Sequence, residues 1–433
     1  MSDFEPRTLR GFRDYLPDVM VPREAMLQKV ASVFRSFGFQ PIATPALEYT
    51  GVLLGKYGDE GDKLLYRFRD NGDRDVSLRY DLTVPLARVM AQHGGAIARP
   101  FKRFQIAPVW RAENPARGRF REFVQCDVDI VGSEGLLADF ECIQVGAEVL
   151  RALGVDRFVI RINDRRILDG LMRHLGITEQ GEQTDVLRVV DKLPKIGWDA
   201  MMAELRQKVT LPEHGEVALK TFLEGGLQAL DGNVVDLSVA QPGIDSLNQL
   251  LAYAEALGIR RYLDVDLSIA RGLDYYTSTI YETFLLDLPS LGSVMSGGRY
   301  DKLLGMFTGE SIPAVGISLG VDRLLAGLTE LGLVPPGVGA PDVFVVIVEA
   351  GETAYALGVA KQLRSAGLNV QTSLEPGAKM GKQFKLAART GATAAVVIGS
   401  TEAATGNLTV KMLSTGEQKT LTAGEITAWV KPS

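Results

Sequence analysis

Hydrophobic positions along the first third of the chain predict one helix followed by a series of strands. Residues 21–37 carry Met26, Val30 and Phe34 at helical spacing, and Gly38 follows as a helix-ending residue. Strand-like segments are expected at 64–69, 76–83, 101–110 and 123–131. So many strands before the next helical stretch favour a mainly antiparallel sheet over a regular βαβ array.

The later pattern predicts an insertion, a linker and a second domain. A mostly helical block at about 163–258 interrupts the strands, and we interpret it as an insertion into one α+β domain that spans 1–330. Residues 331–341 are rich in proline and glycine and predict a linker. Strands and helices alternate in 342–433, as in a small α/β domain with a mostly parallel sheet. The fold class is therefore α/β in the broad sense.

Strand alternation groups polar side chains that could form a site. Along 123–131, the face opposite the apolar one carries Gln125, Asp127 and Asp129. Along 76–83, one face is expected to carry Arg79, Asp81 and Thr83. Acids and amides on one side of otherwise apolar strands suit a ligand that bears an amine. The ordinary alternative is a sheet face exposed to solvent.

The segment 99–123 is strongly basic, with seven basic residues against two acidic ones. Two strands joined by a loop of proline, glycine and arginine predict a hairpin with a cationic tip. Most of the cations are guanidinium groups, each of which can bind two phosphate oxygens at once through two parallel hydrogen bonds. The alternative is a solvated charged hairpin, which the one-sided charge disfavours.

Three further segments suit a small ligand. Tyr275 and Tyr276 offer flat walls for a ring, although such pairs are often found in cores. Gly297 and Gly298 predict a tight turn where a ligand can approach the backbone, or an ordinary hairpin turn. Arg323 is expected in the first turn of a helix, where a phosphate could bind, although many such arginines only meet solvent.

The composition is that of an ordinary globular protein, with 46% hydrophobic and 23% charged residues. A net charge of −6 argues against a protein that coats nucleic acid without selectivity. Cys126 and Cys142 are too few for a disulfide framework or a structural zinc site. No apolar stretch has the length of a membrane span. We therefore expect a reduced, cytoplasmic protein with no membrane association.

Metal and common nucleotide motifs are missing from the sequence. His93, His174 and His214 are far apart and in no ligand spacing, so we interpret them as surface or packing residues and expect no protein-held metal. The segment GAKMGKQ is one residue short of a P-loop and lacks its Ser or Thr. No GxGxxG opens a βαβ unit. A nucleotide site of the Walker or Rossmann type is thereby excluded.

Several segments together make the chain similar to the histidyl-tRNA synthetases, a family of class II aminoacyl-tRNA synthetases. The segments are LRYDLTVPLAR, VWRAENPARGRFREFVQCDVDIVG, ARGLDYYT, SGGRYD and AVGISLGVDRL. The combination of ARGLDYYT with SGGRYD is specific to the histidyl type. The resemblance extends over nearly the whole chain, and 342–433 resembles an anticodon-binding domain.

The resemblance implies that L-histidine is activated with ATP to histidyl-adenylate and then transferred to the 3′ end of tRNA(His) in protein synthesis. It implies a histidine pocket made of Asp81, Thr83, Arg111, Gln125, Asp129, Arg271, Tyr275, Tyr276, Gly298 and Tyr300. It implies an ATP site made of Arg111, Glu113, Arg119, Phe123 and Arg323. Arg271 occupies the position of the family's catalytic arginine, and Arg111 is the second catalytic group. ATP is a substrate that brings its own Mg²⁺.

The partners are also implied in part by the resemblance. In the C-terminal domain, Lys379, Lys382, Lys385 and Arg389 have the spacing of one helix face, which in most proteins is simply solvated. Given the resemblance, these four residues and Arg117 are the candidate contacts to tRNA. The family further implies a homodimer.

One paralogue of the family offers a different function. The regulatory subunit of ATP phosphoribosyltransferase binds histidine without charging tRNA; it typically lacks the anticodon-binding domain and has a degraded RGLDYY segment. Both features are intact in this sequence. A third hypothesis, a nucleotide- or RNA-binding module without chemistry, leaves the co-occurrence of all the segments unexplained.

Overall fold

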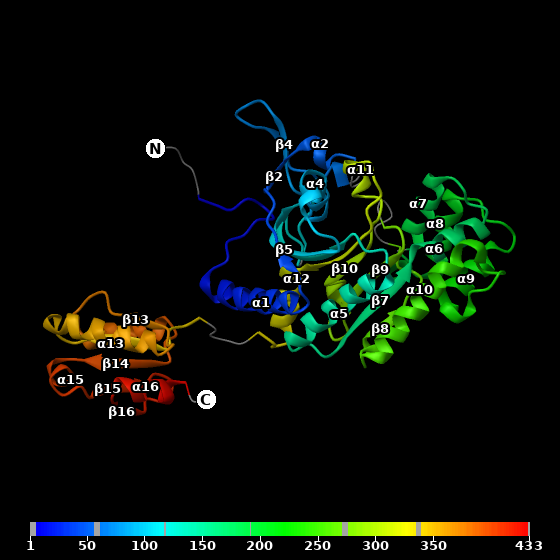
Figure 1. The fold of residues 1–433 in the computed structure, drawn as a ribbon. Coiled ribbons are helices and arrows are strands. Elements are labelled where there is room, and N and C mark those ends of the chain that lie inside the picture. The colour runs from blue at the N-terminus through cyan, green and yellow to red at the C-terminus, as the bar shows by residue number, and fades with distance from the viewer. Residues whose placement is uncertain are drawn as a thin grey trace. The chain divides into compact units, whose positions relative to one another are not determined.

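A computed structural model describes residues 6–55, 61–116, 118–190, 192–270, 276–334 and 339–431. The chain forms two compact units, one of residues 1–14 and 26–334 and the other of 15–25 and 335–433. Figure 1 shows the elements of both units. Helix α1 (Pro17–Ser36) contributes residues to each of them.

An eight-stranded sheet forms the centre of the first unit, in the order β1-β5-β6-β11-β10-β9-β7-β8. Only the two edge pairings, β1 with β5 and β7 with β8, are parallel, which confirms a mainly antiparallel sheet. Its strands are β1 (Gln40–Pro41), β5 (Phe101–Trp110), β6 (Glu122–Val131), β7 (Phe158–Asp164), β8 (Leu263–Val265), β9 (Thr279–Leu285), β10 (Met295–Arg299) and β11 (Ala314–Gly320). A separate sheet pairs β2 (Leu47–Tyr49), β4 (Asp75–Leu78) and β3 (Arg67–Arg69) in that order.

Helices cover one face and one edge of the large sheet. Helix α5 (Leu136–Ala152) packs on β6, β10 and β11, where Cys142 and Ile143 share a core with Cys126 and Val128 of β6. The block predicted as an insertion holds α6 (Arg165–His174), α7 (Gln180–Val190), α8 (Leu193–Lys208), α9 (Gly215–Gly225) and α10 (Leu237–Ala256). Helices α6 to α9 gather beyond the edge formed by β7 and β8, and α10 packs on these strands (Figure 1). Other α-helices of this unit are α2 (Thr50–Leu53), α4 (Thr83–His93), α11 (Gly305–Thr308) and α12 (Val321–Glu330).

Two local predictions are wrong. The strand expected at 76–83 ends at Leu78, and α4 begins at Thr83, because the backbone N–H of Val84 donates to the Asp81 carboxylate and opens a helical turn. Gly297 and Gly298 lie inside β10 and not in a turn. A Cβ on either residue would lie within 2.5 Å of neighbouring atoms, so these glycines let the strands pack closely.

The second unit contains a five-stranded sheet in the order β13-β12-β14-β15-β16. Strands β13, β12 and β14 are parallel, and β15 and β16 extend the sheet as antiparallel strands. The strands are β12 (Val343–Ile347), β13 (Val370–Thr372), β14 (Ala394–Ile398), β15 (Leu408–Met412) and β16 (Gln418–Leu421). Its helices are α13 (Thr353–Ser365), α14 (Met380–Arg389), α15 (Ser400–Thr405) and α16 (Ala423–Val430).

Within the described ranges, no helix combines the length and apolar character needed to cross a bilayer. The same ranges contain no group of three or more His, Cys, Asp or Glu side chains placed to hold a metal ion. Cys126 and Cys142 are both buried. Although distant in the sequence, the rings of His174 and His214 meet edge to face, with centroids 4.9 Å apart.

Candidate functional site: two adjoining cavities

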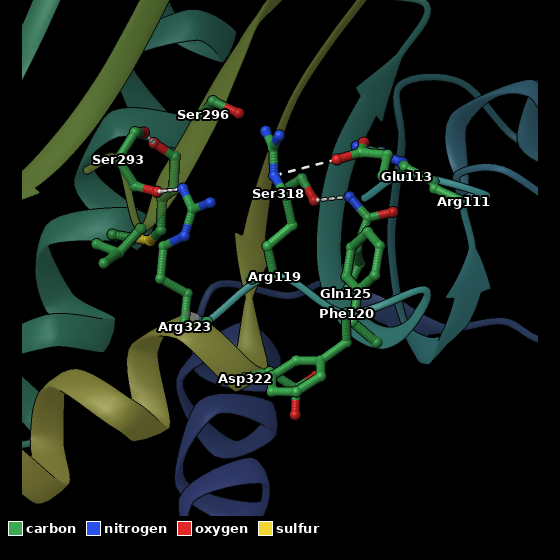
Figure 2. Close-up of a pocket in the computed structure, with 15 residues that line it drawn as sticks. Arg111, Glu113, Arg119, Phe120, Gln125, Ser293, Ser296, Ser318, Asp322 and Arg323 are labelled. Atoms are coloured by element: carbon green, nitrogen blue, oxygen red, sulfur yellow. Dashed lines mark hydrogen bonds and ion pairs between the residues drawn. The ribbon is translucent and has the colours of Figure 1, made fainter. Parts of the chain in front are cut away.

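Two cavities of opposite character meet on the polar face of β6. Arg111, Gln125, Ser296 and Ser318 line both of them. The cavities hold about 760 and 1070 Å³ of space that opens to solvent, which suits ligands of nucleotide and amino-acid size. Figure 2 shows the first cavity and the shared side chains.

The second cavity is acidic. The acidic residues that line it are Asp81, Asp127, Asp129 and Glu282. Of the described lining residues, only Arg111 is basic, and it stands where the two cavities meet. Such a distribution of charge matches a ligand with a cationic end in the cavity and an anionic end at its mouth.

The acids on β6 project as the alternation predicts. Gln125, Asp127 and Asp129 line the cavity, whereas Cys126 and Val128 lie in the core behind it. Asp127 and Asp129 are 2% and 3% exposed, so the alternative of a solvent-exposed face is wrong. Burial raises the pKa of Asp127 to about 7 and also raises the pKa of Asp129.

Arg103 on β5 is the counter-ion of this acidic cluster. Its Nη2 lies 2.6 Å from Oδ2 of Asp129, and its side chain has no exposed surface. The same nitrogen donates to the carbonyl oxygen of Leu82 at 3.2 Å. In the sequence, Arg103 was only counted in the basic charge of 99–123; in the structure it lies within β5, as the strand expected at 101–110 implies, and its side chain points into the unit. One guanidinium faces two buried carboxylates and leaves room for another cation.

Tyrosines and glycines shape the wall and floor of the acidic cavity. Tyr276, Tyr281 and Tyr300 line it; the Tyr300 hydroxyl donates to Asp129, and that of Tyr281 to the carbonyl of Gly316 at 3.0 Å. Burial raises the pKa of Tyr300 well above its usual value, so the ring keeps its proton. Gly297 lines the cavity; the next residue, Gly298, packs under the ring of Tyr276, which a Cβ there would approach to 2.9 Å.

Asp81 and Thr83 reach the same cavity from the N-terminal end of α4 and not from a strand. Oδ1 of Asp81 accepts the N–H of Val84 at 3.0 Å. Leu82, which lies between them, is fully buried. Its burial anchors the backbone of this segment, so that Asp81 and Thr83 reach the cavity beside β6.

The first cavity is basic. Three arginines, Arg111, Arg119 and Arg323, enter it from the loop after β5 and from α12 (Figure 2). Arg111 donates through Nε to the carbonyl of Tyr80 at 3.1 Å, and its guanidinium lies 4.2 Å from the Tyr80 ring centroid and 5.2 Å from that of Phe123. Stacking between two rings holds this cation at the wall shared by the cavities.

The other two arginines are held by polar partners. Nε of Arg119 lies 3.0 Å from Oε2 of Glu113, and Nη1 of Arg323 donates to the carbonyl of Ser293 at 2.6 Å. Arg323 is in the first turn of α12 as predicted, with Asp322 beside it. Asp322 accepts from Arg13 at 2.6 Å and from the N–H of Val124 at 3.1 Å, which ties α12 to β6.

Some predicted residues lie elsewhere. Arg271, Tyr275 and Arg117 fall outside the described residues. The C-terminal cations are exposed, and all belong to α14 or directly precede it; they are Lys379, Lys382, Lys385 and Arg389. Lys382 pairs with Glu375 at 2.5 Å, with both side chains more than 60% exposed.

Sequence reasoning assigned no role to several side chains that line the acidic cavity, among them Tyr281, Glu282 and Ser318, nor to Arg103, which pairs with Asp129. Ser318 pairs directly with Asp127 on β6 in the antiparallel sheet. The pairing of β6 with β11 could not be read from the sequence, because it is set by packing across nearly two hundred residues.

The comparisons with known proteins agree with this geometry. A family model described as histidyl-tRNA synthetase matches residues 11–324, and one described as an anticodon binding domain matches 342–432. The chain is 47% identical to a histidine–tRNA ligase of Rhodopirellula baltica over 423 residues, which are 96% of this chain and 95% of that one.

Solved structures show the same likeness. The histidyl-tRNA synthetase of a Nostoc species is 34% identical, with a TM-score of 0.85 over 99% of this chain and all of that one. A Bacillus halodurans chain described as an ATP phosphoribosyltransferase regulatory subunit/histidyl-tRNA synthetase has a TM-score of 0.74 over 86% of this chain and 94% of its own. At 22% identity, that likeness is one of fold alone.

The antiparallel sheet and its paired basic and acidic cavities are those of a class II aminoacyl-tRNA synthetase. The family is now evident from the matched residues and from identity over nearly the full length. The chain belongs to the histidyl-tRNA synthetase family.

Proposed function

We propose that this chain activates L-histidine with ATP to form histidyl-adenylate and passes the histidyl group to the 3′ end of tRNA(His), as a histidine–tRNA ligase. One observation carries the assignment of the two cavities: the charge changes sign across the wall that holds Arg111. The acidic side suits the ammonium group of an amino acid, and the basic side suits phosphates. The carboxylate and the α-phosphate would then meet at the shared wall.

On the acidic side, we assign the ammonium group to Asp81, Thr83, Gln125 and Asp129. The imidazole would lie against Tyr276 and Tyr300, with Gly298 behind the Tyr276 ring. Tyr275, outside the described residues, is assigned to the same wall through the family resemblance. A neutral Tyr300 that already donates to Asp129 keeps that carboxylate oriented.

On the basic side, the adenine would stack on Phe123, with its amino group on Glu113. Arg119 and Arg323 would hold the outer phosphates, and Mg²⁺ would arrive bound to ATP. Arg119 would leave Glu113 in the process, which costs little because the Arg119 side chain is 56% exposed in that pair.

In the first step, a histidine carboxylate oxygen attacks the α-phosphorus, and the bond from that phosphorus to the pyrophosphate oxygen breaks. Negative charge develops on the α-phosphoryl oxygens and on the leaving pyrophosphate. Arg111 would neutralise the former from a fixed position between two rings, so no reorganisation is needed in the transition state. Through the family resemblance, we assign a second cation to Arg271, which lies outside the described residues, and no side-chain nucleophile is required.

The test is ATP–pyrophosphate exchange measured with each amino acid in turn. Exchange with histidine alone is the expected result. Histidine binding without any exchange would instead favour a regulatory subunit of ATP phosphoribosyltransferase, although the anticodon-binding match at 342–432 disfavours that function.

Transfer to tRNA requires a second surface. We assign it to the exposed cations Lys379, Lys382, Lys385 and Arg389, with Arg117 near the acceptor end. Replacing the four C-terminal cations by alanine should raise the KM for tRNA at least about tenfold and leave pyrophosphate exchange unchanged. Equal loss of both activities would contradict this assignment.

We further propose the domain division 1–330 for catalysis and 342–433 for the anticodon, joined by 331–341, with the helical block at 163–258 as an insertion. We also propose a cytoplasmic homodimer. Light scattering at micromolar concentration should give twice the mass of the chain, and the mass of one chain would rule the dimer out.

A further inference from the structure

A chain of three side chains crosses the wall between the two cavities. Asp127 on β6 pairs with Ser318 on β11, and Gln125 lies two residues before Asp127 on the same face. The Ser318 hydroxyl donates to Oδ1 of Asp127 at 2.5 Å. Nε2 of Gln125 donates to Oγ of Ser318 at 2.6 Å. The three groups therefore form one directed relay.

The direction of the relay decides which end of the Gln125 amide faces the ligand. A serine hydroxyl has a single proton, and a short bond to an ionised carboxylate uses it. Oγ of Ser318 can then only accept, so it must face the amide nitrogen. The amide oxygen is left buried and without a hydrogen-bond partner among the described residues. Figure 2 shows the nitrogen turned toward Ser318 and the oxygen turned away from it.

We propose that Asp127 is a positioning residue for histidine: acting through Ser318, it holds the Gln125 amide with its oxygen toward the site, where it accepts from the substrate ammonium. This inference rests on the proposed function, since it concerns the amine of the same substrate. Asp127 need not touch the substrate. The opposite amide orientation would present two N–H donors to a cation and repel it.

The relay reverses when Asp127 gains a proton. A neutral carboxyl group can donate to Oγ of Ser318, whose own proton then turns to Gln125 and is best accepted by the amide oxygen. Burial brings the pKa of Asp127 to about 7, so this change falls in the physiological range. The charged groups around it are Arg103 on β5, Asp129 on β6, Asp81 and Arg79 between β4 and α4, and, in the same cavity, Arg111 and Glu282.

The test follows kcat/KM for histidine in ATP–pyrophosphate exchange from pH 6 to 9, because this parameter reports ionisations of the free enzyme. The wild type, Asp127→Asn, Ser318→Ala and Ser318→Thr are compared. The imidazole of the substrate titrates in part of this range, but identically for every variant. Ser296→Ala, the same change at the shared wall outside the relay, is the matched control.

In the wild type, we expect kcat/KM for histidine to fall as the pH is lowered through about 7, where Asp127 gains its proton. Asp127→Asn and Ser318→Ala should lack this step in the pH profile. At pH 8.5, both variants should raise the KM for histidine about tenfold with little change in kcat or in the KM for ATP. Ser318→Thr, which keeps a hydroxyl, should restore the wild-type profile, and Ser296→Ala should retain it.

Superimposable pH profiles for the wild type, Asp127→Asn and Ser318→Ala would overturn the relay. Equal changes in the KM for histidine and for ATP would do so as well, since they would indicate a merely structural role. Absence of histidine-dependent exchange in the wild type at every pH would instead refute the proposed function, so the two failures are distinguishable. Circular dichroism of each variant checks that the fold is retained.

Discussion

The two cavities share Arg111 and one face of β6, yet they hold their charges in different ways. On the acidic side, Arg103 and Asp129 form an ion pair with 0% and 4% of their side chains exposed. On the basic side, Arg119 and Glu113 form one with 56% and 16% exposed. The first is part of the packed sheet, whereas the second is partly in solvent.

This difference implies that the acidic cavity is formed before a ligand binds, whereas the ion pair in the basic cavity can be exchanged for contacts with the ligand. A buried pair keeps its geometry because either charge alone in the interior is costly. A half-exposed pair contributes little and can be replaced by a phosphate at little cost. The amino-acid end of the site would thus be rigid before binding, which favours selectivity, and the ATP end would adjust as the nucleotide arrives.

The largest effect is expected from Arg103→Ala. It leaves Asp127 and Asp129 without their buried counter-ion and opens a cavity, so the free energy of unfolding should fall by about 3–5 kcal/mol. Urea unfolding at pH 8 measures the loss. A loss as small as that of an exposed pair would break the contrast between the two cavities.

A stability difference that depends on pH should distinguish Asp127→Asn from the wild type. Because the folded pKa is raised to about 7 from 3.8, the carboxyl group contributes stability below pH 4 that is lost as pH rises to 7. The loss amounts to at most about 4 kcal/mol. The asparagine variant does not titrate, so its melting temperature relative to the wild type should rise between pH 5 and pH 8.

A constant difference in melting temperature across that range would mean that Asp127 has an ordinary pKa. Ser296→Ala, which removes no titratable group, serves as the control. Its melting temperature relative to the wild type should stay constant across the range.

Substitution of the shared residue should affect both substrates. Arg111→Ala removes a cation fixed between two rings, and kcat/KM in pyrophosphate exchange should fall about 10²–10³-fold. The KM for ATP and the KM for histidine should both rise. A rise in only one of them would assign Arg111 to a single cavity.

The smallest effect is expected from Arg119→Ala. Loss of its exposed pair with Glu113 should change the free energy of unfolding by less than about 1 kcal/mol. The KM for ATP should rise severalfold while the KM for histidine stays the same. Destabilisation comparable to that of Arg103→Ala would contradict an exchangeable pair.

The sequence was sufficient to predict which β6 side chains share a face. It was insufficient to predict which residue pairs with them. Alternation placed Gln125, Asp127 and Asp129 together, because a strand has a fixed period of two. It could not show that Arg103 meets Asp129, since register between strands depends on packing. Two residues counted in the basic segment 99–123 have acidic partners: Arg103 forms a buried pair with Asp129, and Lys102 forms a partly exposed pair with Glu141.

The segment after β4 shows a signal that was present but misread. Apolar alternation in 76–83 suggested a strand, but Asp81 followed by Pro85 marks a helix start, with the carboxylate capping the first turn.

In the C-terminal sheet, by contrast, part of the structure left no clear signal in the sequence. The predicted alternation of strands and helices in 342–433 includes helix α14 and the buried strand β14, whereas the half-exposed hairpin of β15 and β16 carries too few apolar residues to stand out.

The glycines under the acidic cavity limit how the enzyme could be redesigned. A Cβ on Gly316 would lie 2.1 Å from the Asp129 carboxylate, and one on Gly297 would lie 2.2 Å from the carbonyl of Gly316. The floor of the pocket is therefore closely packed at these glycines. No single substitution there can make the pocket shallower without displacing a strand. A variant that accepts a different amino acid would have to be sought among the walls, at Tyr276, Tyr281 and Tyr300, and its new substrate could differ in ring shape more readily than in length.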